Sequence, residues 1–206
     1  MHYVFVHGWG FHNGIWSSLI ESLRPEKVSF IDLGFVRGGP PPAADIPSDA
    51  ICVGHSLGVL WLLKQTLPPM KALISVCGFD CFFAHADPKI LRTMRAGLAR
   101  NPEAQLRSFW TACGAEPFCT ADQFVLPALA EGLTWLETWD AREAHRALTC
   151  PRLALAAADD LVVRQPMCEV VWSGETLVWS DHGGHLLPAA RPDWCAQHIK
   201  TFADDL

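Results

Sequence analysis

A serine, an aspartate pair and a histidine occur in this chain in an order that could support nucleophilic catalysis. Ser56 stands at the centre of Gly54-His55-Ser56-Leu57-Gly58, an aspartate pair follows at Asp159 and Asp160, and His185 lies further on. A serine hydroxyl becomes nucleophilic when an imidazole takes its proton, and the imidazole needs a carboxylate on its other nitrogen. The order Ser, Asp, His is one of the orders in which this constellation occurs. These residues therefore predict nucleophilic attack by Ser56.

The residues around Ser56 indicate a tight turn between a strand and a helix. Residues 51–53 form a short apolar run typical of a buried strand, and 57–67 carry apolar residues at helical spacing. Gly-x-Ser-x-Gly in that context is a nucleophile elbow, and an ordinary glycine-rich turn is the alternative. A tetrahedral oxyanion needs two donors, and we expect the backbone N–H groups of Trp9 and Leu57 to supply them.

The acid and the base of this predicted constellation each have an alternative residue nearby in the sequence. Asp159 and Asp160 both follow the same apolar run, and the residues alone do not choose between them. His182 lies close to His185, but the two glycines directly before His185 suit a loop that turns the ring towards Ser56. We therefore assign the base to His185.

Apolar runs that alternate with helical patterns predict an α/β fold of about six strands, mostly parallel and trimmed in size. The residues that could bind a ligand or take part in catalysis all lie just after the carboxyl ends of expected strands, where parallel sheets have their ligand sites. These groups are His7-Gly8-Trp9-Gly10, Ser56, the aspartate pair and His185. The expected strands cover residues 3–6, 28–33, 51–53, 72–76, 153–158 and 176–179.

The strand pattern stops between residues 79 and 149, where helical patterns replace it. Asp87-Pro88, Asn101-Pro102 and the capping box from Thr120 to Gln123 each mark a helix start. We therefore predict a core of residues 1–78 and 150–206 with a helical cap inserted at 79–149. Residues 34–47 contain four prolines and three glycines, so we expect a loop without a helix there.

Composition excludes several classes of protein. The 206 residues are 50% hydrophobic, enough for one sizeable core, and the net charge of −6 argues against nucleic acid as the main partner. The eight cysteines are scattered without a Cys-x-x-Cys pair, which favours reduced thiols. No run has the length of a membrane span, and the first residues lack the features of a secretory signal. We expect a cytoplasmic protein that engages neither nucleic acid nor membrane.

Further residues resemble one family closely. The chain is similar to the α/β-hydrolases from its first strand to its last helix, and within them to the pimeloyl-acyl-carrier-protein methyl esterases of biotin synthesis. The residues that carry this likeness are His7-Gly8-Trp9-Gly10, Gly54-His55-Ser56-Leu57-Gly58, 72–76 leading into Cys81-Phe82, Asp159-x-Leu161-Val162 with Arg164, and His185 with Pro192.

The resemblance implies a choice between Asp159 and Asp160, and the chain departs from the family pattern in two places. The family pattern of an acid, any residue, Leu and Val matches Asp159, so the resemblance implies a triad of Ser56, Asp159 and His185, with Asp160 as a turn residue. The family usually begins with an extra β-hairpin, for which the residues before His7 leave no room. The Pro-rich loop also takes the place of the helix that usually follows the second strand.

An apolar wall is expected around Ser56. We predict that Trp9, Phe79, Phe82, Phe83 and Trp110 bind substrate, and that further cap aromatics contribute to the same wall. Packing within the core is the alternative for each cap aromatic, because aromatic residues at helical spacing are usually buried for packing. The further cap aromatics are Phe109, Trp135 and Trp139.

One face of the helix expected at 88–100 is basic. Arg92, Arg95 and Arg100, with Lys89 and Arg107 nearby, could dock an acidic acyl-carrier protein or its phosphate, and a solvated helix face is the alternative. No metal-binding spacing is present, so neither a metal nor another cofactor is expected.

The sequence thus predicts a serine carboxylesterase that cleaves an acyl methyl ester, with pimeloyl-acyl-carrier-protein methyl ester as the substrate that the resemblance implies. A thioesterase or a lyase on the same triad is a second hypothesis. A catalytically silent hydrolase fold used for binding is a third, and the presence of all three catalytic residue types argues against it.

Overall fold

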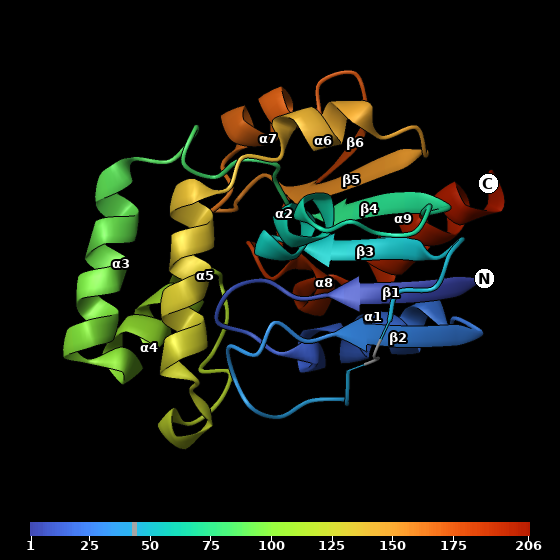
Figure 1. The fold of residues 1–206 in the computed structure, drawn as a ribbon. Helices are drawn as coiled ribbons and strands as arrows, with labels where there is room; N and C mark the ends of the chain where they lie inside the picture. The colour runs from blue at the N-terminus through green and yellow to red at the C-terminus, as the bar shows by residue number, and fades with distance from the viewer. Residues whose placement is uncertain (43–44) are drawn as a thin grey trace.

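A six-stranded parallel sheet runs through the centre of the computed structural model, which describes residues 1–42 and 45–206 (Figure 1). The strands lie in the order β2-β1-β3-β4-β5-β6, and every neighbouring pair is parallel. The predicted α/β sheet is therefore confirmed. The strands are β1 (His2–Val6), β2 (Lys27–Ile31), β3 (Ile51–His55), β4 (Ala72–Val76), β5 (Arg152–Ala157) and β6 (Thr176–Ser180).

The central strands are buried on both faces, which explains their uninterrupted apolar sequences. Every residue of β3 and β4 is buried. Val53 pairs with Phe5 on one side and with Ile74 on the other, so the middle of the sheet is a continuous apolar layer. This layer fixes the carboxyl ends of β1, β3 and β4 at one edge of the sheet.

Helices cover both faces of the sheet (Figure 1). On one face α1 packs against α9, which also contacts α8; on the other, α2 packs against β3 and β1, with α6 beside it. The helices are α1 (Ser17–Leu23), α2 (Leu57–Lys64), α3 (Pro88–Arg100), α4 (Pro102–Ala112), α5 (Leu126–Thr138), α6 (Arg142–Ala147), α7 (Gln165–Val171), α8 (Leu187–Ala190) and α9 (Pro192–Asp204), with short 3₁₀ helices η1 (Asn13–Trp16) and η2 (Ala121–Gln123). Within the described residues, no helix has the length and apolar character needed to cross a membrane.

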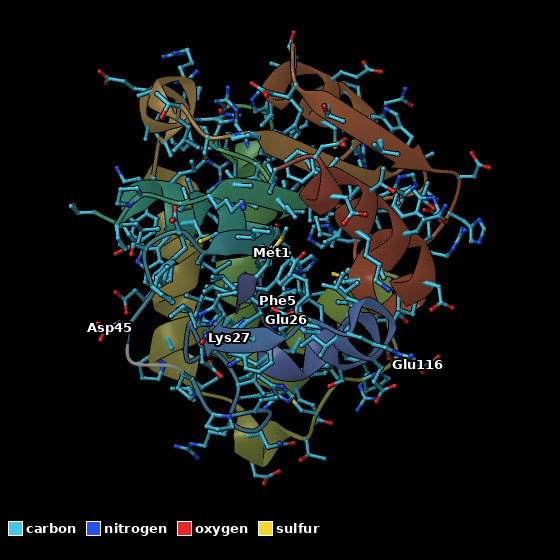
Figure 2. The ribbon with its side chains drawn as sticks, turned by 90° about the vertical axis from the view of Figure 1, so that its right-hand side faces the viewer. Met1, Phe5, Glu26, Lys27, Asp45 and Glu116 are labelled. Carbon is cyan, nitrogen blue, oxygen red and sulfur yellow. The ribbon has the colours of Figure 1, made fainter. Side chains whose placement is uncertain are left out.

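The amino ends of the strands lie on the side opposite to the helices α3, α4 and α5. Figure 2 looks onto that side and shows Met1 next to Glu26. The amino-terminal ammonium group donates a hydrogen bond of 3.0 Å to the Glu26 carboxylate, and both groups are exposed. Phe5, four residues further on, is fully buried, so β1 enters the core at once.

The helices α3, α4 and α5 lie together beyond the carboxyl ends of the strands (Figure 1). α3 contacts both α4 and α5, while α6 returns to pack against α2. Two of the three helix starts expected from capping patterns are present, with Asp87 and Asn101 accepting hydrogen bonds from the backbone N–H groups of Lys89 and Ala104. The capping box from Thr120 to Gln123 starts only the short 3₁₀ helix η2, and α5 begins separately at Leu126. The division into a core and a cap at 79–149 stays a prediction.

Three short helices were not expected from the sequence. α6, α7 and α8 have seven residues or fewer, so their apolar residues do not form a long periodic pattern. The expected loop at 34–47 contains no helix among its described residues, and Ala43 and Ala44 lie outside them.

Candidate active site

Ser56 occupies a strained turn between β3 and α2, as the sequence predicts. Its φ of 54° and ψ of −123° lie outside the region that a serine normally adopts. Gly58 is required two residues later, because a Cβ atom there would collide with the carbonyl oxygen of Val6. The strain fits a function, because strained backbone of this kind concentrates at active sites.

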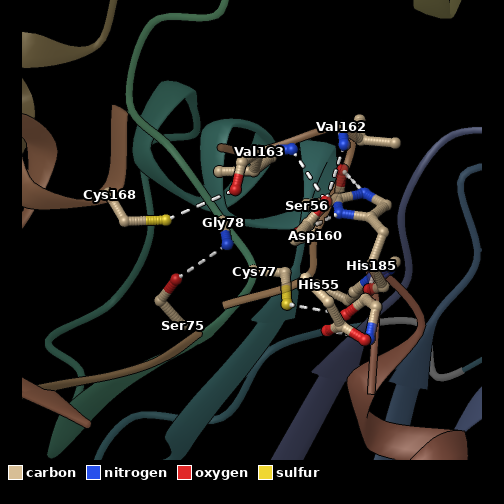
Figure 3. Close-up of polar contacts among 12 residues, drawn as sticks. His55, Ser56, Ser75, Cys77, Gly78, Asp160, Val162, Val163, Cys168 and His185 are labelled. Carbon is tan, nitrogen blue, oxygen red and sulfur yellow. Dashed lines mark hydrogen bonds and ion pairs between the residues drawn. The ribbon is translucent and has the colours of Figure 1, made fainter. Parts of the chain in front are cut away.

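A hydrogen-bonded line joins Ser56, His185 and Asp160 (Figure 3). His185 Nε2 lies 2.9 Å from Ser56 Oγ, and His185 Nδ1 lies 2.8 Å from Asp160 Oδ2. The carboxylate can only accept, so Nδ1 carries a proton and donates it. In the neutral ring Nε2 is then unprotonated and accepts the hydrogen bond of the serine hydroxyl. This is the arrangement of a nucleophile, a base and an orienting acid.

The acid in this line is Asp160, so the interpretation of Asp159 as the partner of His185 is wrong. The backbone N–H of Asp160 donates to the carbonyl of Ala157 in the turn that ends β5, and its side chain is buried against His185. The carboxylate of Asp159 instead accepts from the backbone N–H groups of Gly183 and Gly184, at 3.3 and 2.8 Å. Asp159 therefore holds the loop that carries His185 without contacting the ring.

Asp160 is held as a carboxylate. Burial by itself raises the pKa of Asp160, but the electrostatic attraction and hydrogen bond of His185, with two backbone donors, outweigh it and lower the pKa below its ordinary value. These donors are the N–H groups of Val162 and Val163, which lie 2.7 and 2.9 Å from Oδ1. The two carboxylate oxygens thus have separate tasks: Oδ1 anchors the side chain and Oδ2 orients the imidazole.

The two residues expected to stabilise an oxyanion lie beside Ser56. Leu57 is the first residue of α2, so its N–H has no acceptor in a preceding turn of the helix. Trp9 follows Gly8, where a Cβ atom would lie 2.9 Å from the Cβ of Ser56. The indole of Trp9 is buried and donates to the carbonyl of Leu129 at 2.8 Å, which ties this loop to α5. The assignment of both N–H groups to an oxyanion hole stays a prediction.

A mostly apolar cavity of about 400 Å³ opens above Ser56. Its walls come from the ends of the strands and from α3, α4 and α5, so the helices beyond the sheet cover the serine. Polar groups are few: Lys89, Thr93, Gln105 and Ser108 are the ones besides Ser56. The apolar lining residues are Trp9, Phe79, Phe82, Ile90, Leu91, Met94, Phe109, Ala112, Leu136, Leu161 and Val162.

The expected aromatic wall is confirmed only in part, since Trp9, Phe79, Phe82 and Phe109 line the cavity and the other aromatics do not. Phe83 is 39% exposed and is not among the residues that line the cavity. Trp110 is buried on the opposite face of α4, where its indole donates to the carbonyl of Gly10 at 3.0 Å. Trp135 and Trp139 stack on each other with ring centroids 4.7 Å apart, away from the cavity.

Several lining residues went unrecognised as site residues in the sequence. Ile90 and Met94 lie on the apolar face of α3, which the helical pattern already revealed, but the pattern does not say that this face is turned towards a serine. Leu161 is 65% exposed although it also lines the cavity, so it forms part of the entrance. The signal available in the sequence was the position of Leu161 directly after the aspartate pair.

The basic face of α3 is smaller than expected. Arg92 and Arg100 are exposed and line a shallow groove together with Lys89. Arg95 is turned towards α5, where its guanidinium lies 2.7 Å from the carboxylate of Glu137. Arg107 pairs with Glu103 on α4 at 2.9 Å. The structure therefore leaves Lys89, Arg92 and Arg100 as the continuous basic surface and removes Arg95 from it.

Cys77 lies close to Asp160 and His185 (Figure 3). Its sulfur, a nitrogen of His185 and a carboxylate oxygen of Asp160 all lie within 4.8 Å of one another, the one such group of potential metal ligands found in the described part of the chain. Burial raises the pKa of the Cys77 thiol well above its ordinary value. Two of the three side chains are thus already bound to each other, and the third is a neutral thiol.

The comparisons with known proteins agree with the resemblance that the motifs indicate. No family model matches the chain. The pimeloyl-[acyl-carrier protein] methyl ester esterase of Pectobacterium atrosepticum is 27% identical over 237 aligned positions, which cover 97% of this chain and 93% of that protein. The esterase of the same name from Shewanella woodyi is 27% identical and covers 79% of this chain and 77% of its own length.

Solved structures confirm the fold. An esterase from Exiguobacterium antarcticum superposes with a TM-score of 0.80 at 15% identity, covering 99% of this chain and 92% of its own. An enol-lactonase from Burkholderia xenovorans gives 0.77 at 14% identity, covering 98% and 91%. The chain has the α/β-hydrolase fold, and the resemblance inferred from its motifs is confirmed.

Proposed function

We propose that this α/β-hydrolase is a serine carboxylesterase that removes the methyl group from an acyl methyl ester. The observation that carries the proposal is the line from Ser56 Oγ through His185 to Asp160, with contacts of 2.9 and 2.8 Å, at the floor of an apolar cavity. A hydroxyl, a base and a buried carboxylate in this geometry support acyl transfer.

The first half of the reaction makes an acyl-enzyme. His185 Nε2 takes the proton of Ser56 as Oγ attacks the ester carbonyl, and the imidazolium that forms is stabilised by the Asp160 carboxylate. The N–H groups of Trp9 and Leu57 are the proposed donors to the oxyanion. The tetrahedral intermediate collapses as His185 gives its proton to the departing methoxide, which leaves as methanol.

The second half frees the serine. Water attacks the acyl carbonyl while His185 again takes a proton, and the returning proton restores the Ser56 hydroxyl as the carboxylic acid leaves. The low pKa of Asp160 keeps its carboxylate charged through both halves, so it accepts no proton itself.

The cavity lining supports an acyl chain as the group next to the reacting ester. A space of about 400 Å³ is in the range of small-molecule sites, and its walls are mainly aliphatic and aromatic. The relatives from Pectobacterium atrosepticum and Shewanella woodyi are named for the pimeloyl methyl ester on acyl-carrier protein. We propose the same substrate class for this chain, and with it a place in biotin synthesis.

A carrier protein would dock on the surface formed by Lys89, Arg92 and Arg100. Lys89 lines both this surface and the cavity, so a phosphate at the cavity entrance would meet a positive charge. The whole chain carries −6, which means that only this local field would attract an acidic partner.

The decisive experiment replaces Ser56 by alanine and compares substrates. We expect the wild-type protein to hydrolyse p-nitrophenyl esters and acyl methyl esters and to react with a fluorophosphonate, and Ser56→Ala to lose about 10⁴- to 10⁶-fold in kcat and all labelling. An intact thermal transition of the variant is the control for folding. Equal turnover by the variant would refute the serine mechanism.

The same assay separates the competing functions. Preferred cleavage of an acyl thioester over the matched methyl ester would identify a thioesterase. No turnover of any ester by the folded wild-type protein would favour a binding protein on a hydrolase fold.

A further inference from the structure

His55 contacts the segments that carry the proposed catalytic groups. It ends β3 and directly precedes Ser56 in the chain, and its Nε2 lies 2.8 Å from the backbone oxygen of His185 (Figure 3). On its other side the ring lies against Gly8, where a Cβ atom would approach Nδ1 to 2.8 Å. The side chain is fully buried and is not among the residues that line the cavity.

The position of the proton on His55 follows from burial and from its partner. Burial, reinforced by the neighbouring His185 and His7, lowers the pKa of His55 to about 3, and the hydrogen bond to the His185 backbone and the charge of Asp160 do not reverse this. The ring is therefore neutral at neutral pH and carries one proton. Because a carbonyl oxygen can only accept, that proton sits on Nε2 and is donated to His185.

The ring is also held firmly in place. Phe11 meets it edge to face with centroids 5.8 Å apart, and Trp16 does the same at 6.3 Å. Its Nδ1 has no partner within the described residues. Among the residues that the structure describes, the ring therefore makes a single hydrogen bond, to the backbone of His185.

The loop before His185 needs such a support. Gly183 and Gly184 have φ values of 130° and 59°, which only glycine adopts readily, and glycine restricts the backbone less than any other residue. Asp159 holds the N–H groups of both glycines, while His55 holds the carbonyl of His185 itself. Loss of that bond would leave a buried carbonyl without a donor and allow the imidazole to move away from Ser56.

We propose that His55 is a positioning residue whose Nε2–H fixes the backbone of His185 so that the imidazole reaches Ser56. This inference rests on the proposed serine hydrolase function. It assigns the variable position of the Gly-x-Ser-x-Gly segment a task in the reaction, although His55 touches neither substrate nor the reacting atoms.

Nitrogen-15 NMR of the wild-type protein tests the proton directly. We expect an Nε2–H signal from His55 that exchanges slowly with water and keeps the chemical shift of a neutral ring from pH 5 to 8. A His55 ring protonated on Nδ1 alone, or one that titrates near pH 6.5, would overturn the inference. The NMR measurement requires no enzymatic activity, so it can refute the inference about His55 without refuting the proposed function.

Two amide substitutions then test the contribution to the reaction. The side-chain nitrogen of glutamine can occupy the place of Nε2, whereas that of asparagine reaches only as far as Nδ1. We expect His55→Gln to keep kcat within about threefold and His55→Asn to lower it by about 10- to 100-fold, with KM unchanged in both, because a small displacement of a catalytic group has an effect of that size.

The kinetics of these two variants either support or refute the positioning role of His55. Rescue by glutamine combined with a loss in kcat for asparagine supports the positioning role. Equal losses in both folded variants, or a loss that appears in KM, would refute it. An inactive wild-type protein would refute the proposed function and leave the NMR result as the test of the hydrogen bond.

Discussion

Replacing Asp160 by asparagine should nearly abolish ester hydrolysis, and the contacts of Asp160 explain why. The N–H groups of Val162 and Val163 both point at Oδ1, so the amide oxygen of the new side chain must take that position. Its NH₂ group then faces His185 Nδ1 and donates to it. The imidazole is forced to carry its own proton on Nε2, where it can no longer accept the proton of Ser56.

The loss in kcat expected for Asp160→Asn is much larger than the loss expected for the neighbouring Asp159→Asn. A base locked in the wrong tautomer lowers kcat by about 10⁴-fold, which corresponds to about 5.4 kcal/mol. Asp159→Asn keeps an oxygen that can accept from Gly184, now at 2.8 Å, and loses at most one weak bond to Gly183. A loss of about 1 kcal/mol, or about fivefold, is expected there.

The assay is kcat for a p-nitrophenyl ester at pH 7.5, with urea unfolding of both variants to confirm that each is folded. The two aspartate variants should differ by about 10³-fold, with Asp160→Asn the slower. A larger loss for Asp159→Asn would show that the hydrogen-bonded line through Asp160 does not operate in the reaction. Equal losses would mean that the loop position, rather than the tautomer, controls the rate.

Three further results are expected. His55 is protonated near pH 6.5 in the unfolded chain but only near pH 3 in the folded chain, so the free energy of unfolding falls as the pH is lowered from about 6.5 to 3. In wild-type protein, His55 accounts for about 2 kcal/mol of the decrease between pH 7 and pH 5. Urea titrations of His55→Gln should show a decrease that is smaller by this amount. Arg92→Glu should raise KM several-fold for a carrier-bound methyl ester and leave p-nitrophenyl esters unaffected, whereas Lys27→Glu at the opposite end of the sheet should change neither. Ala112→Phe should fill part of the cavity and lower kcat/KM for octanoyl relative to acetyl p-nitrophenyl ester; an unchanged ratio would place the acyl chain elsewhere.

The close approach of Ser56, the aspartate pair and His185 was predictable, because a parallel sheet brings the carboxyl ends of its strands together. The groups that follow β3, β5 and β6 were therefore expected in one place before any distance was known. The choice between Asp159 and Asp160 was not predictable in the same way. Side chains alternate within a strand, but both residues lie in the turn after Ala157, where the alternation no longer tells which one points inward.

The roles of the side chains on α3 and α4 depend on partners that lie far away in the sequence. The face of α4 that carries Trp110 is buried, and the carbonyl of Gly10, 100 residues away in the sequence, accepts its indole N–H. Arg95 is withdrawn from the basic surface by Glu137, on α5. Helical spacing identifies the two faces of each helix, but it does not say which face meets the sheet, which meets the cavity and which meets solvent.

The trimmed core keeps its site because the Pro-rich loop performs a structural task of its own. Phe35 is fully buried against Trp135 and His7, and the backbone of residues 35–37 is bound to residues 123–125. Arg37 N–H donates to the carbonyl of Gln123 and Val125 N–H to that of Phe35, with a β-bridge between Val36 and Phe124.

This bridge fixes the start of α5, and α5 in turn controls the site. Its Leu129 carbonyl accepts the indole N–H of Trp9, and its Leu136 lines the cavity. A loop beside the edge strand β2 thus positions both the proposed oxyanion-binding segment and the cavity wall. This segment needs no helix to position Ser56, Asp160 and His185, because β3, β5 and β6, which carry them, lie on the other side of β1.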